Sequence, residues 1–238
     1  MDFGKAFTFF SEDPDWLGKI AIGSLIVLIS PLLLGIPFLL LVGYQVAVTR
    51  LVMNGERNRL PSWDNMGQLF MDGLNLFIAL LVYSSPALLL LCFGFAAFLL
   101  PALGGGNDEV MGALAGVSVG IWALMICLVM LLSLALGFIV PALNVQYVRH
   151  KSLGALFRFG EVLQITRDNL GDIVLAWLAL LVANLLLQVV IAIVSITICG
   201  PFILGLAGTV WFLAATGHLY GQIGARMGPA TPLKAAAL

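Results

Sequence analysis

Charged side chains are missing from four long stretches of the chain. These stretches cover residues 20–49, 73–107, 110–148 and 173–225, and apolar side chains dominate each of them. A helix needs about 20 apolar residues to cross the roughly 30 Å hydrocarbon core of a bilayer. Only helices and closed barrels satisfy their own backbone in lipid. The pattern therefore predicts an all-α fold, namely a polytopic helical membrane protein.

Breaks in the apolar pattern divide the later stretches into helices. The second stretch predicts a span at about 74–100, which ends in the turn-forming sequence PALGGGNDE, and the third predicts a span at about 111–140. The fourth stretch is interrupted by CGP at 199–201 and splits into two spans. These three stretches together predict four spans.

The first stretch is too long for one upright helix and slightly short for two ordinary ones. Pro31, Gly35 and Pro37 lie within it. A proline inside a helix costs about 3 kcal/mol and frees a backbone group that lipid cannot satisfy. We therefore expect a tight hairpin of two short helices, at about 16–30 and 36–53, which brings the total to six spans. A single kinked span over the whole stretch is the alternative.

The composition agrees with lipid as the main surroundings and removes several classes of function. Of 238 residues, 61% are hydrophobic and 10% are charged, against about 25% charged in an ordinary soluble domain. A net charge of -1 without a Lys/Arg cluster argues against nucleic acid as a partner. Cys92, Cys127 and Cys199 have no metal-ligand spacing, so we expect buried free thiols, no metal and no cofactor. The first apolar run shows no cleavage pattern, so no removed signal peptide is expected.

Basic residues next to the predicted spans indicate how the chain is threaded. They occur in the connectors around 50–59 and 149–167 and in the C-terminal tail, but not in the connectors at 101–109 and 198–201. Lys and Arg favour the cytoplasmic side of a membrane. We therefore predict a multi-pass protein of the cell (inner) membrane with both termini in the cytoplasm. A single kinked first span would place the N-terminus outside.

A weak internal repeat relates the two parts of the chain. A shift of 96 residues places Trp63 on Phe159 and Asp72 on Asp168, and each copy runs into a long apolar helix. We expect one integral membrane domain over residues 1–238 with two loosely repeated halves. The halves cover about 16–100 and 110–223.

Two short amphipathic helices are predicted to lie on the membrane surface, at 62–73 and 152–169. Each combines an apolar face at helical spacing with charged side chains, which is typical of an interfacial helix. The side chains expected to anchor them are Trp63, Phe70, Asp72, Phe159, Arg167 and Asp168. A shorter third case is indicated by the spacing of Phe3, Phe7 and Phe10.

The acids of these segments allow two interpretations. Asp64, Asp72, Glu161 and Asp168 could face one another across a pseudo-twofold axis as catalytic pairs. They could instead cap helices and pair with arginines at the level of the lipid headgroups. Since no nucleophile or metal-ligand pattern accompanies them, we favour the structural interpretation and predict no catalytic residue. The arginines available for pairing are Arg57, Arg59, Arg158 and Arg167.

Few polar side chains lie inside the predicted spans. His218 is expected to bond a neighbouring helix, with a proton or ligand role as the alternative. Asn184 and Gln188 are four residues apart and therefore share one helical face. They either line a polar path or form interhelical hydrogen bonds worth about 1 kcal/mol each.

Small residues recur along one predicted span. Gly112, Gly116 and Gly120 lie one above another on a helix and allow close approach of a second helix. They form either a packing seam within the chain or a contact for another subunit.

Several motifs occur in a characteristic order along nearly the whole chain. They are EDPDW, a Pro/Gly-broken hairpin ending in GYQVAVTR, LPSWDNMGQLFMDG, FRFGEVLQITRDNLGD and GHLYGQ. In this respect the chain resembles a prokaryotic family of integral membrane proteins catalogued as domain of unknown function four thousand and thirteen. The resemblance implies a small polytopic membrane protein without an established activity, and it transfers no catalytic residue.

These observations favour a non-catalytic role. We expect a scaffold or accessory subunit that packs against membrane lipids, other membrane proteins or further copies of itself. The alternative is a small-solute or lipid transporter, in which the halves rock about a cavity lined by Asn184, Gln188 and His218. An intramembrane enzyme is a third class, which would need a catalytic constellation at one depth in the membrane.

Overall fold

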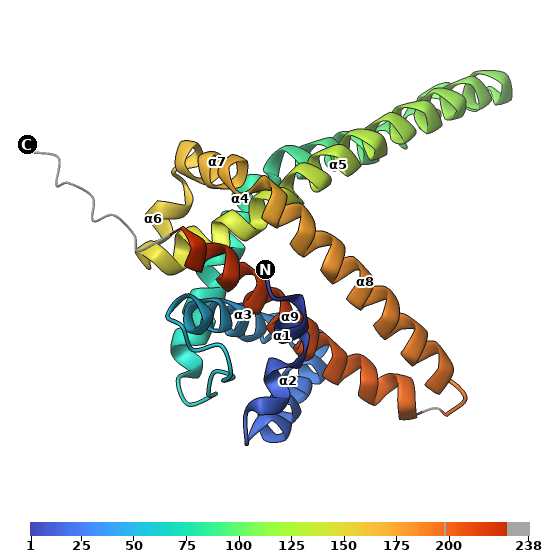
Figure 1. Cartoon of the computed structure of the whole chain (residues 1–238). Coiled ribbons are helices and arrows are strands. Elements are labelled where there is room, and N and C mark those ends of the chain that lie inside the picture. Colours follow the sequence, from blue (N-terminus) through green and yellow to red (C-terminus); the bar gives the residue numbers. More distant parts are fainter. Residues whose placement is uncertain (198, 228–238) are drawn as a thin grey trace, which may run out of the picture. The chain divides into compact units, whose positions relative to one another are not determined.

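The computed structural model describes residues 1–197 and 199–227, and all regular secondary structure in this part of the chain is helical (Figure 1). Pro86 and Pro141 lie inside two of the longest helices. The elements in chain order are α1 (Phe3–Thr8), η1 (Phe9–Glu12), α2 (Trp16–Ile29), η2 (Ser30–Leu33), α3 (Phe38–Met53), α4 (Met66–Ala97), η3 (Leu100–Gly104), α5 (Asp108–His150), α6 (Leu153–Leu156), α7 (Phe159–Asp168), α8 (Leu170–Val194) and α9 (Cys199–Arg226).

The chain forms two compact units. Unit 1 contains residues 1–78 and the described residues from 141 onward, and unit 2 contains residues 79–140. The assignments of α4 and α5 continue across the boundaries, so each of these helices contributes one part to each unit.

Five segments of the described chain are long and apolar enough to cross a membrane. They are Trp16–Leu33, Met66–Gly104, Asp108–His150, Leu170–Val194 and Gly200–Arg226. The remaining predicted span, at about 36–53, corresponds to α3, which has 16 residues and would extend about 24 Å at 1.5 Å per residue. The chain is therefore an all-helical membrane protein with five candidate spans and one shorter apolar helix.

The predicted break in the first apolar stretch is confirmed. Between α2 and α3 the chain forms the 3-10 turn η2 and then reverses through Leu34 and Gly35, whose φ angles are 53° and 79°. A glycine adopts a positive φ without steric cost, whereas Leu34 does not. Pro37 then precedes the first residue of α3, where its missing N–H is harmless.

Glycines on α9 allow close contact with α3 in the core of unit 1. An alanine methyl group at Gly217 would lie 2.5 Å from the carbonyl oxygen of Gln45, and one at Gly221 would lie 2.6 Å from Val52 Cβ. Gly224 meets Met53 in the same way. Positions 217, 221 and 224 share one helical face, so α9 has a small-residue seam of the kind that lets membrane helices approach closely.

The predicted surface helix at 62–73 is wrong as a separate element. Residues 66–73 form the first turns of α4, which continues to Ala97. Gly73 does not end the helix. It lies where α4 crosses α3, and a methyl group there would collide with the backbone of Leu39. A single glycine costs a helix only about 1 kcal/mol, and tertiary packing outweighs that cost.

The second predicted surface segment is divided into two helices. The short α6 is followed by a break at Phe157 and Arg158, and α7 is an amphipathic helix. It buries Val162, Ile165 and Thr166 while its other side chains are exposed. A short amphipathic helix is therefore present at 159–168, and its position at a membrane surface stays a prediction.

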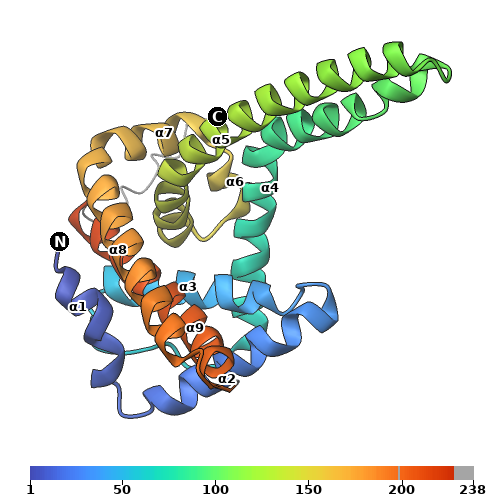
Figure 2. The same ribbon diagram turned by 90° about the vertical axis from the view of Figure 1, so that its right-hand side faces the viewer.

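Unit 2 is an antiparallel pair formed by the second part of α4 and the first part of α5, drawn in green in Figure 2. Gly94 lies against the Trp122 ring, and Ser118 Oγ donates to the carbonyl oxygen of Ala97 over 2.7 Å. The turn contains Gly105 with φ 59°, and Asn107 Oδ1 accepts backbone N–H bonds that cap α5. The predicted turn at PALGGGNDE is thus confirmed.

The cysteines of unit 2 differ from the prediction. Cys92 and Cys127 are free but exposed on the outer surfaces of α4 and α5 rather than buried. The reason is that few side chains of unit 2 have neighbours within that unit, so an apolar position here faces outward. The Cys199 side chain lies outside the described part of the structure.

Candidate functional site

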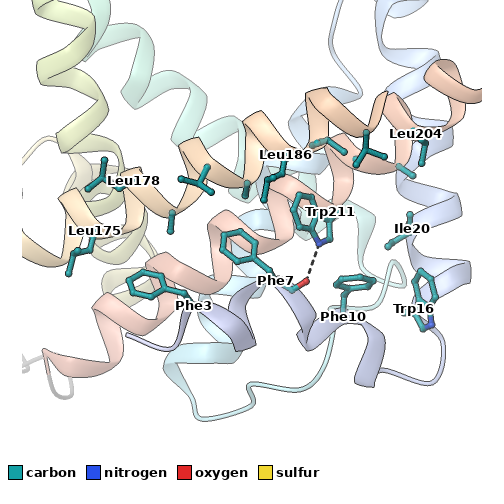
Figure 3. A pocket seen from close by; sticks show the side chains of 17 residues that line it. Phe3, Phe7, Phe10, Trp16, Ile20, Leu175, Leu178, Leu186, Leu204 and Trp211 are labelled. Atoms are coloured by element: carbon teal, nitrogen blue, oxygen red, sulfur yellow. Dashed lines mark hydrogen bonds between the residues drawn. The ribbon is translucent and has the colours of Figure 1, made fainter. Parts of the chain in front are cut away.

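A large apolar cavity lies in unit 1 between the N-terminal segment, defined as residues 1–20, and helices α8 and α9 (Figure 3). Its volume is about 890 Å³, within the roughly 300–1,000 Å³ typical of small-molecule sites. Its lining consists of Phe3, Phe7, Phe10, Trp16, Ile20, Leu175, Leu178, Ala179, Val182, Ala183, Leu186, Leu187, Val190, Leu204, Ala207, Gly208 and Trp211. No charged side chain is among them.

The aromatic wall of the cavity comes from the N-terminal segment. Asp2 caps α1 by accepting a 2.9 Å bond from the Lys5 N–H, which starts a helix just long enough to place Phe3 and Phe7 on one face. The Phe7 ring lies 5.7 Å from the Trp211 ring. The spacing of the phenylalanines thus indicates a real apolar face, and in the structure this face is turned toward α8 and α9.

The opposite wall is one face of α8. Its lining side chains recur at three- and four-residue intervals from Leu175 to Val190, as expected for a single helical face. Leu185 lies between lining positions in the sequence yet points elsewhere, and it is not part of the cavity. Small residues make room: Ala179 and Ala183 on α8 and Ala207 and Gly208 on α9 leave space between larger leucines.

Hydrogen bonds attach the start of the N-terminal segment to α9. Gln222 Oε1 accepts from Asp2 N over 2.7 Å, and Gln222 Nε2 donates to Asp2 O over 2.8 Å. The second N–H of this amide reaches His218 Nδ1 at 3.1 Å. The Gln222 amide therefore uses both of its donors and its oxygen in this attachment.

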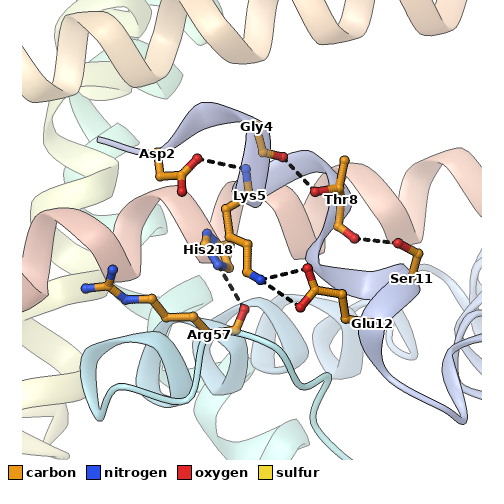
Figure 4. Close-up of polar contacts among 8 residues, drawn as sticks. All are labelled: Asp2, Gly4, Lys5, Thr8, Ser11, Glu12, Arg57 and His218. Atoms are coloured by element: carbon orange, nitrogen blue, oxygen red, sulfur yellow. Dashed lines mark hydrogen bonds and ion pairs between the residues drawn. The ribbon is translucent and has the colours of Figure 1, made fainter.

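His218 belongs to the same network. It is fully buried, its Nε2 lies 3.3 Å from the Arg57 carbonyl oxygen (Figure 4), and the Phe9 ring lies 4.5 Å away. A carbonyl oxygen can only accept, so Nε2 carries the proton and Nδ1 accepts from Gln222. Both ring nitrogens therefore form hydrogen bonds within the protein. The ring does not line the cavity.

Two ion pairs lie on the polar side of the N-terminal segment. Lys5 Nζ contacts the Glu12 carboxylate at 2.7 Å (Figure 4), and Lys19 Nζ contacts Asp13 at 2.7 Å. Asp13 also accepts from the backbone N–H of Leu60 over 2.9 Å. Burial raises the pKa of Asp13, but its bonds to Lys19, Leu60 and the Asp15 N–H together leave that pKa below its ordinary value.

A second polar cluster ties α3, α4 and α5 together within unit 1. Arg50 contacts Asp72 at 2.9 Å, Tyr147 Oη donates to Asp72 over 2.8 Å, and Asn75 Nδ2 donates to Tyr147 Oη over 2.9 Å. Asp72 is buried, so it is not an anchor on a wet surface. Its arginine is Arg50 of α3 and not one of the arginines predicted to pair with these acids.

The other predicted acids do not converge on Asp72. Glu161 accepts from Gln146 over 2.7 Å and from Arg158 at 3.4 Å, while Asp64 and Asp168 are exposed. In the described part of the chain no group of three His, Cys, Asp or Glu side chains could hold a metal ion. Asp72 and Glu161 therefore have structural partners, and the catalytic interpretation of the four acids stays a prediction.

The predicted anchoring side chains have mixed surroundings. Trp63 is 6% exposed and stacks on Tyr44 with ring centroids 4.4 Å apart, so it lies in the core of unit 1. Phe70 is half-buried, whereas Phe159 and Arg167 are exposed on α7. Amphipathic spacing identified apolar faces here, but it could not distinguish a face buried against α3 from one exposed to lipid.

The residues proposed for a polar path do not line the apolar cavity, and the polar path stays a prediction. Asn184 is half-buried and Gln188 exposed on α8, and neither of them lines the cavity, nor does His218. Reasoning from sequence concentrated on polar side chains inside spans and missed the apolar cavity. The one available signal was the phenylalanine face of the N-terminal segment.

The predicted glycine face lies in unit 2. A methyl group at Gly112, Gly116 or Gly120 would meet nothing within 4 Å. Within unit 2 no helix packs there, and both interpretations of this face, a seam within the chain or a contact for another subunit, stay predictions. A small-residue seam within unit 1 lies on α9.

Comparison with known proteins places the chain in a family. No curated protein and no solved structure matches it. The family model described as "Protein of unknown function (DUF4013)" matches residues 22–196, which is well over half of the chain. This range includes the motifs described above except EDPDW and GHLYGQ. The chain belongs to this family of unknown function.

Proposed function

We propose that the protein is a non-catalytic scaffold or accessory subunit of the membrane that packs against lipids and other membrane proteins. The observation that carries this proposal is the uncovered surface of unit 2. None of the most apolar 18-residue window of α5 is buried within the chain. Within unit 2 the two apolar helical segments contact only each other, so their outer surfaces require lipid or a partner around them.

The glycine face indicates which side of α5 contacts a partner. On α5, Ser118 bonds Ala97 and Trp122 covers Gly94, whereas Gly112, Gly116 and Gly120 lie on the other side of the helix with open space around them. Small residues at four-residue spacing let a second membrane helix approach closely. We therefore assign this face to contact with a helix of another subunit.

The proposal includes a threading of the chain. The protein lies in the inner membrane, and α3 is a short sixth span. The cytoplasmic side then carries both termini and the basic connectors around residues 50–59 and 149–167. The absence of a catalytic role is supported by the paired acids: Asp72 and Glu161 are held by neighbouring side chains.

Assembly measured in native membrane patches tests the proposal. Protein extracted with its surrounding lipid by an amphipathic polymer is expected to carry at least one further protein chain when analysed by native mass spectrometry. Replacing Gly112, Gly116 and Gly120 together by Ile should release that chain. Val117→Phe adds four side-chain carbons, as many as each single Gly→Ile change, at an exposed neighbour and should leave assembly intact. A wild-type chain found alone, or equal assembly in both variants, contradicts the proposal.

A lipid carrier is the second candidate function, because the cavity of unit 1 is large and apolar. A carrier of polar solutes has no such support. Reconstituted vesicles with fluorescent lipid distinguish the candidates: a carrier accelerates exchange of that lipid between leaflets, whereas a scaffold leaves the exchange rate at that of protein-free vesicles.

A further inference from the structure

We propose that the apolar cavity of unit 1 binds an acyl chain of a membrane lipid. The inference rests on the proposed packing of the protein against lipid and deepens it by naming a site. The cavity lies between the N-terminal segment and two helices, α8 and α9, that are themselves candidate spans. Lipid chains therefore surround the opening of the cavity.

The lining selects an apolar occupant. Water enters a cavity only where it finds about two to four polar partners, and this wall is made of aliphatic and aromatic side chains. The polar groups of the lining side chains are the indole N–H groups of Trp16 and Trp211, and that of Trp211 already donates to the Phe7 carbonyl oxygen over 3.3 Å (Figure 3). A polar solute would lose its hydration and find too few hydrogen-bond partners in return.

The dimensions fit a single long chain. Lining residues on α8 run from Leu175 to Val190, which corresponds to about 22 Å at 1.5 Å per residue. This exceeds the roughly 15 Å depth of one leaflet's hydrocarbon, so an acyl chain can lie in the cavity along most of its length. Each buried CH₂ group contributes about 0.8 kcal/mol, which makes binding depend on chain length.

The charges near the cavity give no means of recognising a headgroup. Lys5 is paired with Glu12, and Lys19 is paired with Asp13 and donates to the Leu60 carbonyl oxygen. Neither lysine is free to bind a phosphate. We therefore expect affinity to depend on the acyl chain and to be similar for zwitterionic and anionic lipids that carry the same chains.

A filled cavity provides the test, with a control on the same helix. In the full-length protein, Ala179→Trp with Leu186→Trp places two indoles in the cavity, whereas Leu185→Trp with Ala192→Trp adds the same side chains at exposed α8 positions outside it. Delipidated protein in detergent is titrated with dioleoyl phosphatidylcholine, dioleoyl phosphatidylglycerol and dihexanoyl phosphatidylcholine. Bound lipid is counted by native mass spectrometry.

We expect one dioleoyl lipid per chain with either headgroup, weaker retention of the dihexanoyl lipid, and about tenfold weaker binding in the filled variant only. If the filled variant fails to fold, Phe7→Ala replaces it, because loss of an aromatic wall should also weaken binding. Equal binding in filled and control variants, equal binding of short and long chains, or a second protein copy in place of lipid would overturn the site. The glycine-face experiment is independent, so the site can fail while the proposed function stands.

Discussion

At the scale of single residues, one glutamine organises the contact between the N-terminal segment and α9. Gln222 bonds both backbone groups of Asp2 and the ring of His218. A buried polar group that loses its partner costs about 1–3 kcal/mol. The position of the aromatic wall of the cavity therefore depends on a side chain that does not line it.

Replacing Gln222 by Ala should release the N-terminal segment. We expect faster trypsin cleavage after Lys5 and a loss of about 1–3 kcal/mol in the free energy of unfolding, because His218 and Asp2 lose their partner. Limited proteolysis and thermal unfolding in detergent measure both effects. The control is Gln188→Ala, at an exposed position, which should change stability by less than about 0.5 kcal/mol. Equal cleavage of the two variants would show that the attachment lies elsewhere.

The ion pair of Asp13 should make stability depend on pH. The folded state lowers the pKa of this carboxyl, so its stabilising effect is present above the unfolded pKa of about 3.9. The effect is lost as the pH falls through the lower folded value. Unfolding temperatures between pH 3 and 6 should therefore converge for wild type and Asp13→Asn at the acid end, whereas Asp15→Asn should follow wild type. A constant difference across this range would contradict the assignment.

Residue patterns predicted some of these features and missed others for a physical reason. The spacing of Phe3, Phe7 and Phe10 correctly indicated an apolar face. Trp63 has the same kind of spacing, but it stacks on Tyr44 in the core. A helical face needs a partner, and only tertiary structure shows whether that partner is lipid or another helix.

At the scale of elements, glycines determine which helices come together. The α9 seam at positions 217, 221 and 224 meets α3, and Gly73 marks the crossing of α3 and α4. The sequence contained both this glycine pattern and the one at Gly112, which are alike in spacing. They differ in what faces them, and spacing alone could not reveal it.

Replacing Gly221 by Ala should therefore destabilise the protein by about 1–3 kcal/mol through overpacking against Val52. Gly205→Ala, on the same helix but with open space around it, should be neutral or slightly stabilising because alanine favours helix. Chemical unfolding of the two variants in the same detergent provides the comparison. Similar losses in both would mean that α9 does not pack closely on α3.

Element boundaries were predictable where proline or several glycines interrupt an apolar run. The breaks before α3 and before α5 lie where Pro31, Pro37 and the glycine turn placed them. The predicted surface helix at 62–73 failed because nothing there ends a helix, and Asp72, read as a surface charge, is buried against Arg50. A charged residue marks the membrane surface only when it is not paired with an opposite charge inside the protein.

At the scale of the whole molecule, composition and charge-free length were sufficient to identify a helical membrane protein. They were not sufficient to count its crossings, because the 16-residue length of α3 fits either a short membrane span or a buried helix. The proposed function depends on what covers unit 2 and what fills the cavity of unit 1, and composition identifies neither.

Cysteine labelling tests the proposed threading. In a chain whose native cysteines are replaced by serine, Asn58→Cys and Ser152→Cys should be protected from an impermeant thiol reagent in intact cells, and Glu109→Cys should react. All three positions are exposed in the structure, so protection reports the side of the membrane rather than burial. Reaction at 58 and 152 with protection at 109 would reverse the orientation.

The central claim is that the outer surface of α5 is dissolved in lipid, and nitroxide accessibility in vesicles measures it most directly. Spin labels at Val117, Leu124 and Leu131, all exposed on α5, should collide readily with oxygen, which concentrates in the bilayer, and rarely with a water-soluble nickel chelate. Collision with the chelate at all three positions would contradict the claim, because it would place this helix in water.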